Sequence, residues 1–325
     1  MSEAKKQQAA RGTVLVLVGP TGVGKTAVSL VLARQLNGEV VNADSRQVYR
    51  YMDIGTAKPE PALRGQVPHH LMDFLDPDQE YSAGRYLEDA RRVVADILSR
   101  WRVPLVVGGS GLYVRALLEG FFGRDARDPR LRSQLELQAA REGARALYEE
   151  LCRVDPACAE KTHPNNLKRI IRALEVYRLT GKPISYWQAR EKDPAPFPYL
   201  KVGLTLPREV LYRRIEQRVE EMFARGLVKE VARLLEMGYS PQLNALNSVG
   251  YREVIAYLEG KIDFDTCKEL VKRNTRRFAK RQLTWFRREA NLHWVAMSET
   301  DSPEQVASRI AALYRTAEAG RDPGP

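Results

Sequence analysis

The sequence predicts an α/β fold, in which a parallel sheet carries helices on both faces and an all-helical lobe is inserted into the core. Two observations support this fold class. Short apolar runs bounded by turn residues alternate with helical segments up to about residue 110 and again after residue 198. Between residues 124 and 198 the strand-like runs vanish and helical patterns dominate. Alternating strands and helices form parallel sheets because each connection crosses back over a face of the sheet.

The first half of the sheet is predicted from four segments that follow one another closely. Apolar runs of strand length and a closing Asn-Gly pair set their limits. In order, we expect a strand at 14–18, a glycine-rich turn at 19–24, a helix at 25–36 closed by Asn37-Gly38, a strand at 40–43 that ends at Asp44, and a strand at 104–107 that stops at Gly108-Gly109.

The remaining elements define the domain organisation. The lobe includes helices over 131–143 and 166–180, with Asn166 as a predicted N-cap. Strands at 202–206 and 292–296, with a long helix from Arg208 between them, return to the sheet. We therefore expect a disordered tail at 1–12, an α/β core at 13–123 and 199–297, the inserted lobe at 124–198, and a C-terminal helix with a frayed end at 298–325.

Composition limits the classes of protein to consider. The formal net charge is +11 and the pI is about 9.6, which favours a polyanionic partner, although solubility alone is an alternative reason. Three cysteines without paired spacing fit reduced thiols, and Cys152, Cys158 and His163 match no zinc pattern. No apolar stretch approaches the ~20 residues of a membrane helix. We expect a cytoplasmic protein.

A phosphate-binding loop is the most specific local motif. Gly19-Pro-Thr-Gly-Val-Gly-Lys-Thr26 matches G-x-x-x-x-G-K-[ST] between a predicted strand and helix. Backbone N–H groups and the positive helix end converge on phosphate there. Lys25 adds a charge, and the Thr26 hydroxyl is a candidate ligand for Mg²⁺. The core is therefore predicted to be P-loop NTPase-like, with a ligand-free glycine turn as the alternative.

An acidic residue is missing where a P-loop ATPase or GTPase usually has one. The strand at 104–107 ends in Gly108-Gly109-Ser110 instead of a carboxylate. Asp44 is the alternative acid, because strand ends and the P-loop face the same crevice in open α/β sheets. Asp44 could act as a general base, a metal ligand or a helix N-cap.

A series of motifs in fixed order resembles bacterial tRNA dimethylallyltransferases. The resemblance covers residues 13 to 297. Besides the P-loop, the motifs are Asn42-Ala-Asp-Ser-Arg-Gln-Val-Tyr49, Met52-Asp-Ile-Gly-Thr-Ala-Lys-Pro59, Pro68-His-His-Leu-Met-Asp73, Gly108-Gly-Ser-Gly-Leu-Tyr113, His163-Pro-Asn165, Arg169-Ile-Ile-Arg-Ala-Leu-Glu-Val176, Arg214-Ile-Glu-Gln-Arg218, Val249-Gly-Tyr-Arg252 and Lys280-Arg-Gln-Leu-Thr-Trp-Phe-Arg287.

The resemblance implies transfer of a dimethylallyl group from dimethylallyl diphosphate to N6 of adenosine 37 in tRNA. Asp44 would be the base, while Thr21, Lys25, Thr26 and Arg218 would bind the diphosphate with Mg²⁺ and stabilise its charge. Ser45 and Gln47 would hold the adenine. The full set of expected diphosphate-binding residues is Gly19, Pro20, Thr21, Gly22, Val23, Gly24, Lys25 and Thr26.

The chain departs from the family pattern at one position and lacks one feature of eukaryotic relatives. Ser110 stands where threonine is usual, so a hydroxyl remains but its geometry is open. No cysteine–histidine zinc finger follows the core, which favours a bacterial type of enzyme.

Basic residues predict an RNA-binding surface on two parts of the chain. Residues 268–288 contain nine basic side chains and one acid. Val271, Phe278 and Trp285 recur at a spacing of seven residues and form an apolar stripe that is expected to dock on the core. Together with basic residues of the lobe, this helix suggests a clamp around an anticodon stem-loop. A solvated charged face is the alternative, and Tyr251 could instead belong to the core. The expected tRNA-binding residues are Asp44, Ser45, Arg46, Gln47, Ser110, Arg132, Lys168, Arg169, Ile170, Ile171, Arg172, Asn247, Ser248, Val249, Gly250, Tyr251, Arg252, Lys280, Arg281, Gln282, Leu283, Thr284, Trp285, Phe286 and Arg287.

Three rival functions remain open at the level of sequence. A P-loop small-molecule kinase would need ATP and no RNA. An RNA-binding module with a vestigial P-loop would not need an intact Lys25-Thr26 pair. Prenylation of free AMP would not need a long basic helix. We expect tRNA prenyl transfer by a monomeric enzyme without membrane attachment.

Overall fold

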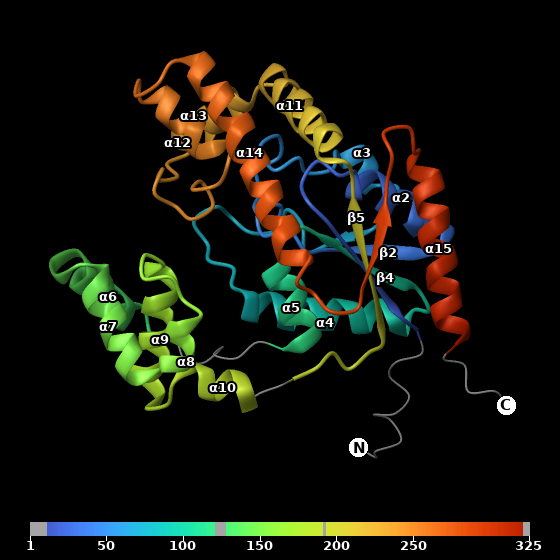
Figure 1. The fold of residues 1–325 in the computed structure, drawn as a ribbon. Helices are drawn as coiled ribbons and strands as arrows, with labels where there is room; N and C mark the ends of the chain where they lie inside the picture. The colour runs from blue at the N-terminus through green and yellow to red at the C-terminus, as the bar shows by residue number, and fades with distance from the viewer. Residues whose placement is uncertain (1–11, 121–127, 191–192, 321–325) are drawn as a thin grey trace. The chain divides into compact units, whose positions relative to one another are not determined.

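A six-stranded sheet, in which every strand pair is parallel, forms the centre of the fold (Figure 1). The computed structural model describes residues 12–120, 128–190 and 193–320. The strand order is β3-β2-β4-β1-β5-β6. The strands are β1 Val14–Val18, β2 Gly38–Asn42, β3 His69–His70, β4 Val103–Gly108, β5 Tyr199–Thr205 and β6 Leu292–Ala296.

The helices account for the rest of the regular structure. In the sheet-forming part they are α2 Lys25–Gln35, α3 Pro61–Arg64, α4 Ala83–Ser99, α5 Gly111–Glu119, α11 Arg208–Ala224, α12 Leu227–Glu236, α13 Tyr251–Leu258, α14 Phe264–Phe286 and α15 Pro303–Ala319. The intervening helices are α6 Pro129–Glu142, α7 Ala144–Val154, α8 Pro156–Glu160, α9 Leu167–Thr180 and α10 Ile184–Arg190.

Both faces of the sheet are covered. Every residue of β1 and β2 is buried, so apolar side chains on alternate faces both find cover. On one face, α2 and α15 pack together over a core that includes Leu15, Leu17 and Leu105. Near-continuous apolar strands of this kind are typical of parallel sheets covered on two sides. The predicted P-loop NTPase-like α/β class is confirmed.

The chain divides into two compact units. Unit 1 spans Met1–Tyr81, Glu88–Val114 and Pro196–Pro325, and unit 2 spans Ser82–Leu87 and Arg115–Ala195. The lobe was expected at 124–198, whereas the boundary of unit 2 falls inside α5, where the helical pattern gives no break. The expected disordered and frayed ends, residues 1–11 and 321–325, lie outside the described residues.

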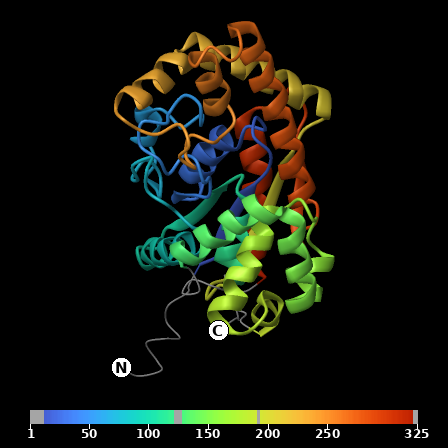
Figure 2. The same cartoon turned by 90° about the vertical axis from the view of Figure 1, so that its left-hand side faces the viewer.

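Unit 2 has a core of its own, built only from helices in its described part (Figure 2). Leu135, Leu147, Leu151, Ile170 and Leu174 are completely buried in it. Side-chain caps fix where α6 and α9 begin. The Asp128 carboxylate accepts hydrogen bonds from two backbone N–H groups ahead of α6, and the predicted Asn166 cap of α9 is confirmed.

Sequence and structure differ in the details of several elements. β2 begins at Gly38, which was expected to close the preceding helix, and ends one residue earlier than expected. The two-residue strand β3 and the four-residue helix α3 had no sequence signal, because elements this short show no periodicity. Each described helix is too short or too polar to traverse a bilayer.

A buried carboxylate joins the sheet to the turn that follows α4. Glu39, on β2, accepts hydrogen bonds from Arg100 Nη2 at 2.9 Å and contacts His70 Nε2 at 2.7 Å. Its side chain is 3% exposed. The hydrogen bond from Arg100, opposed by burial and helped by His70, lowers the pKa of Glu39 to about 2. The ionised form is therefore strongly favoured in the folded state.

We predict that Glu39→Gln lowers the free energy of unfolding by about 2 kcal/mol at pH 7, because the buried side chain loses its charge-assisted hydrogen bond from Arg100, which keeps its exposed partner Asp96. The folded pKa lies below the unfolded value, so the stabilisation is complete above about pH 4.5 and declines as the pH falls towards 2. Urea unfolding at pH 7, 5 and 3 measures it. Asp96→Asn removes an exposed partner of the same arginine and should cost less than about 1 kcal/mol. Equal losses for the two variants would contradict the prediction.

Candidate active site

The P-loop lies between β1 and α2, where the chain turns sharply. Gly22 and Gly24 have φ values of 83° and 101°, which side-chain-bearing residues rarely adopt. A Cβ at Gly22 would also lie 2.8 Å from Ile215. With Gly24 as the N-cap, α2 begins at Lys25, so Thr26 lies in its first turn. The loop therefore turns backbone N–H groups and a helix N-terminus towards one point.

Lys25 is held over this loop by the loop itself. Its Nζ donates hydrogen bonds to the carbonyl oxygens of Gly19 and Pro20, both at 2.9 Å. Burial lowers the pKa of Lys25 to about 8, the nearby charge of Asp44 opposes that shift, and Arg218 reinforces it. Lys25, Asp44 and Arg218 are thus close enough for their charges to act on one another.

Arg218 reaches the P-loop from α11. Its Nη2 donates to the Thr21 hydroxyl, and burial lowers its pKa, with the charge of Asp44 acting in the opposite direction. Its Nε is buried and has no hydrogen-bond partner among the described residues. An unsatisfied buried N–H of a cation is costly, so this group fits an anionic ligand that it could meet beside Thr21.

Asp44 follows the end of β2 and lies near Lys25 and Arg218. Its Oδ1 accepts a hydrogen bond from the backbone N–H of Arg46 at 2.9 Å, and its own N–H donates to Asn42 Oδ1 at 3.1 Å. The helix N-cap interpretation is wrong, because the next helix along the chain, α3, starts only at Pro61. The carboxylate is instead oriented by a tight turn.

A single pocket, hereafter the crevice, is lined by Asp44, Arg218 and the P-loop residue Thr21, while Lys25 is not among its lining residues. Its volume is about 270 Å³. Loops after the strand ends, α11, α14 and the segment before α13 all contribute to its wall. The lining residues are Thr21, Asp44, Ser45, Arg46, Gly55, Thr56, Arg218, Val219, Met222, Asn247, Ser248, Val249, Gly250, Arg252, Val271, Thr275, Phe278 and Arg281.

Many residues that the sequence singled out therefore meet at one site. From opposite ends of the chain, Thr21, Asp44 and Arg218 come together, and so do Ser45, Arg46, residues 247–250, Arg252 and Arg281. Gly55, Thr56 and Phe278 are lining residues to which the sequence assigned no contact with a ligand. Gly55 and Thr56 belong to the sequence motif at 52–59, but the path of this loop has no sequence signal, so their position in the crevice could not be predicted.

Gln47, which was expected to hold the adenine, and Ser110, which was expected to contact tRNA, have other partners in this structure. The Gln47 amide Nε2 donates to the carbonyl oxygens of Thr56 at 3.1 Å and Ala57 at 3.3 Å. The Ser110 hydroxyl accepts a hydrogen bond from Ser45 N–H at 3.0 Å, so serine keeps a contact at the position where threonine was expected. Both side chains fix the backbone around Asp44.

The stripe expected to dock α14 on the core is wrong for Phe278, which is 38% exposed and lines the crevice. Val271 is buried, and Trp285 is 36% exposed but packs its indole against Gly111. The residues of α14 that are buried recur mostly every four positions and so follow a different line along the helix. They are Cys267, Val271, Thr275, Ala279, Gln282 and Phe286.

Gln282 ties α14 to the P-loop. Its Oε1 accepts the N–H of Thr21 at 2.8 Å, and its Nε2 donates to the carbonyl oxygen of Gly109 at 3.0 Å. A Cβ at Gly109 would lie 2.2 Å from that Nε2, so glycine is needed there. Gln282 was expected to contact tRNA, but its side chain is buried and already engaged.

Other expected tRNA contacts are corrected for the same reason. The side chains of Ile170, Ile171, Tyr251 and Phe286 are 2% exposed or less. Leu283 packs partly buried against the core. Thr284 is exposed, with its hydroxyl donating to the carbonyl oxygen of Lys280, so its expected tRNA contact stays a prediction. The buried apolar side chains hold these helices in place, and other residues of the same helices are exposed to solvent.

The basic side chains of α14 include half-buried ones that form ion pairs and exposed ones that form none within the described chain. Lys268 and Lys272 share Glu220, and Arg276 pairs with Glu216. Arg277, Lys280 and Arg281 are exposed and form no ion pair within the described chain. Arg287 is exposed as well. The positive track is therefore narrower than the sequence suggested.

In unit 2, Lys168 and Arg169 are exposed at the start of α9. Arg172 pairs with the buried Glu175 at 2.6 Å, and Arg132 contacts Glu136 at 3.3 Å. Of these four basic residues, Lys168 and Arg169 are therefore the two that are exposed enough to contact RNA phosphates.

Comparison with known proteins gives a consistent result. Residues 47–289 match the family model described as IPP transferase, and residues 12–67 match one described as isopentenyl transferase. A tRNA dimethylallyltransferase of Geobacter sulfurreducens is 50% identical over 306 residues, 93% of this chain and 98% of that protein. One from Pelotomaculum thermopropionicum is 47% identical over 311 residues, 95% and 97% of the two chains.

Solved structures agree in fold. The tRNA isopentenylpyrophosphate transferase of Bacillus halodurans has a TM-score of 0.71 and 39% identity, covering 95% of this chain and 99% of that one. A eukaryotic dimethylallyltransferase acting on tRNA has a TM-score of 0.83 and 30% identity, covering 96% and 80%. The family models and the similar proteins match this chain over most of its length, and the motifs that they share with it supply residues of the crevice. The chain therefore belongs to the tRNA dimethylallyltransferase family.

Proposed function

We propose that this chain transfers a dimethylallyl group from dimethylallyl diphosphate to N6 of adenosine 37 in tRNA, with Asp44 as the general base. The observation that carries the proposal is that the crevice brings the carboxylate of Asp44 together with Arg218 and the P-loop residue Thr21, near enough to Lys25 for the charge of Asp44 to act on it. The names of the curated relatives support the reaction.

On the donor side, the chain's own groups bind and neutralise the diphosphate. The P-loop N–H groups, Lys25, and Arg218 with its unsatisfied Nε meet the phosphate oxygens. As the bond from allylic C1 to the diphosphate oxygen breaks, the electron pair stays on the leaving group. Positive groups already in place stabilise that charge without reorganising.

Mg²⁺ fits this site by the chemistry of the donors. This ion is usually held by one or two protein oxygens together with substrate phosphates and water. The hydroxyl of Thr26 supplies such an oxygen in the first turn of α2. Bound there with the diphosphate, Mg²⁺ would add charge neutralisation at the leaving group.

On the acceptor side, Asp44 removes the proton that the reaction releases. N6 of the adenine attacks C1, and as the C–N bond forms the proton on nitrogen becomes acidic and passes to the carboxylate. The Arg46 N–H holds Oδ1 and so fixes the direction of the carboxylate. Adenosine 37 lies in a folded RNA loop, so its adenine has to leave the stack of neighbouring nucleotides to enter the crevice.

Basic surfaces supply affinity for the anticodon stem-loop. Arg277, Lys280 and Arg281 on α14, Arg287 just after it, and Lys168 and Arg169 on α9 are exposed to meet phosphates. Phosphate contacts position RNA, whereas groups in the crevice select the base. Arg281 also lines the crevice, with its guanidinium 5.8 Å from the Phe278 ring centroid.

We predict that Asp44→Asn lowers kcat for transfer by about 10²- to 10⁴-fold, because the proton acceptor is lost while the shape of the side chain is kept. The measurement is the mass added to adenosine 37 when purified protein, Mg²⁺, dimethylallyl diphosphate and unmodified tRNA are mixed without ATP. The dissociation constant for tRNA should change less than about threefold, and Asp78→Asn, on an exposed loop, should match wild type. Loss of tRNA binding in Asp44→Asn would show that Asp44 is not mainly a base.

We also predict that binding of dimethylallyl diphosphate weakens above about pH 8. The free enzyme's Lys25 has a pKa of about 8, and the bound diphosphate favours its protonated form. Affinity is therefore greatest below pH 8 and should fall up to about tenfold per pH unit above it. Calorimetric titrations between pH 7 and 9.5 test this. Lys25→Met should bind more weakly with a nearly flat profile, and an unchanged profile in that variant would assign the titration to another group.

The double variant Arg277→Ala, Lys280→Ala should weaken tRNA binding and reduce the slope of log Kobs against log salt concentration by about 0.7–0.9 for each phosphate that is no longer neutralised. Lys268→Ala, Lys272→Ala is the matched control, since both lysines already pair with Glu220 and should change the slope less. If the control lowers the slope as much as the test variant, the exposed middle of α14 is not the interface.

A further inference from the structure

The turn at residues 52–58 is a wall of the crevice that the mechanism above does not explain. Gly55 and Thr56 from this turn line the crevice together with Asp44. Ala57 in the same turn has a φ of 51°, a left-handed conformation that costs about 1–2 kcal/mol outside glycine. The turn is not part of a helix or strand, so contacts from elsewhere must hold its shape.

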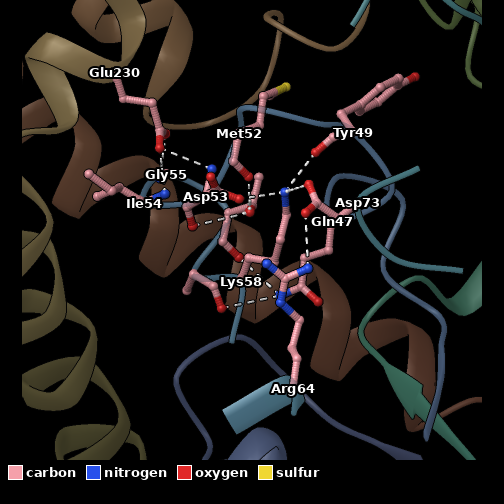
Figure 3. A network of polar contacts seen from close by, with 12 residues as sticks. Gln47, Tyr49, Met52, Asp53, Ile54, Gly55, Lys58, Arg64, Asp73 and Glu230 are labelled. Carbon is pink, nitrogen blue, oxygen red and sulfur yellow. Dashed lines mark hydrogen bonds and ion pairs between the residues drawn. The ribbon is translucent and has the colours of Figure 1, made fainter. Parts of the chain in front are cut away.

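Glu230 is the main anchor of this turn (Figure 3). It projects from α12, and its Oε2 accepts the N–H groups of Asp53 at 3.0 Å and Ile54 at 2.7 Å. Its Oε1 accepts the N–H of Gly55 at 3.1 Å and the hydroxyl of Tyr251 at 2.6 Å. Four donors thus converge on one carboxylate, and charge-assisted bonds of this kind are the stronger class.

Tyr251 makes the arrangement rigid. The side chain is completely buried, and a Cβ at Gly55 would lie 2.4 Å from its ring. Burial, and then the charge of Glu230, raise the pKa of Tyr251 well above its ordinary value, so the phenol stays a donor. Residue 55 must therefore be glycine for the turn to lie on the ring.

The other end of the turn is tied to the segment that carries Asp44. Gln47 Nε2 donates to the carbonyl oxygens of Thr56 and Ala57. Lys58, with a side chain 1% exposed, donates to the Tyr49 carbonyl oxygen at 2.8 Å and contacts Asp73 at 2.7 Å and Asp53 at 2.6 Å (Figure 3). The turn is thus fixed between Glu230 and the Asp44 segment, and none of these bonds involves the P-loop.

We infer that Glu230 is a positioning residue for the acceptor base. By fixing the turn at 52–58 against Tyr251, it sets the distance between the wall at Gly55-Thr56 and the carboxylate of Asp44, between which the adenine enters. This inference rests on the proposed function. The inference predicts different effects on the two substrates. The hydrogen bonds of Glu230 support the wall at Gly55-Thr56, whereas none of them reaches the P-loop that is proposed to bind the diphosphate.

The test compares Glu230→Gln with wild type in two kinetic series, one varying tRNA and one varying dimethylallyl diphosphate. An amide side chain places an N–H among the four donors in either orientation, so the turn loses anchoring contacts. We expect kcat/KM for tRNA to fall about tenfold or more, while KM for dimethylallyl diphosphate stays within about twofold. Glu236→Gln, an exposed change on the same helix, should behave as wild type.

A second readout does not depend on catalysis. Hydrogen exchange of the amides of residues 53–55 should accelerate about tenfold or more in Glu230→Gln and stay unchanged in Glu236→Gln. Tyr251→Phe removes one donor, keeps the ring and should give an intermediate effect on both readouts. It serves as the test if Glu230→Gln does not fold.

The outcomes distinguish this inference from the proposed function. Faster exchange with unchanged kcat/KM for tRNA, or a rise in KM for dimethylallyl diphosphate as large as the fall in kcat/KM for tRNA, would overturn the positioning role while wild-type transfer keeps the function intact. Absence of transfer to tRNA by the wild-type protein would instead overturn the proposed function and, with it, the acceptor role of the wall.

Discussion

The placing of a carboxylate beside two cations at the carboxyl edge of a parallel sheet is the constraint on which the site depends. Asp44 follows β2, Lys25 follows β1 through the P-loop, and Arg218 comes from α11. Each cation is partly desolvated and the carboxylate offsets that cost, as the shifted pKa of Lys25 reflects. In the proposed function, the same charges serve the two halves of a prenyl transfer, departure of an anion and removal of a proton.

The supports around this centre divide between the two substrates. Gln282 joins α14 to the Thr21 N–H and the Gly109 carbonyl oxygen, so the helix proposed to meet RNA also braces the phosphate loop. Glu230 and Tyr251 brace the opposite wall. Gln282 and Tyr251 are buried, Glu230 is half-buried, and each is hydrogen-bonded, an arrangement that specifies one geometry more strictly than apolar packing does.

Helix α14 shows how one element can have two uses. Its buried residues recur along one line and fix it on unit 1, while Arg277, Lys280 and Arg281 remain exposed. Three other basic residues are neutralised by Glu216 and Glu220 of α11. Pairing with a neighbouring helix removes these cations from the set available to phosphate, a distinction that composition cannot make.

The sequence by itself determined the fold class, the P-loop and the resemblance to a family, because strand–helix alternation and the glycine pattern are local. It also identified Asp44, Thr21 and Arg218, although the motifs that contain them lie far apart in the chain. Only the tertiary structure decided which side chains are buried. Tyr251, Gln282, Ile170 and Ile171 fall inside motifs yet pack inward, whereas Phe278 was expected to dock and instead lines the crevice. The role of Glu230 had no sequence signal, since it depends on a turn 175 residues away presenting its N–H groups. Periodicity reports the faces of one helix, but what covers each face depends on segments that meet only after folding.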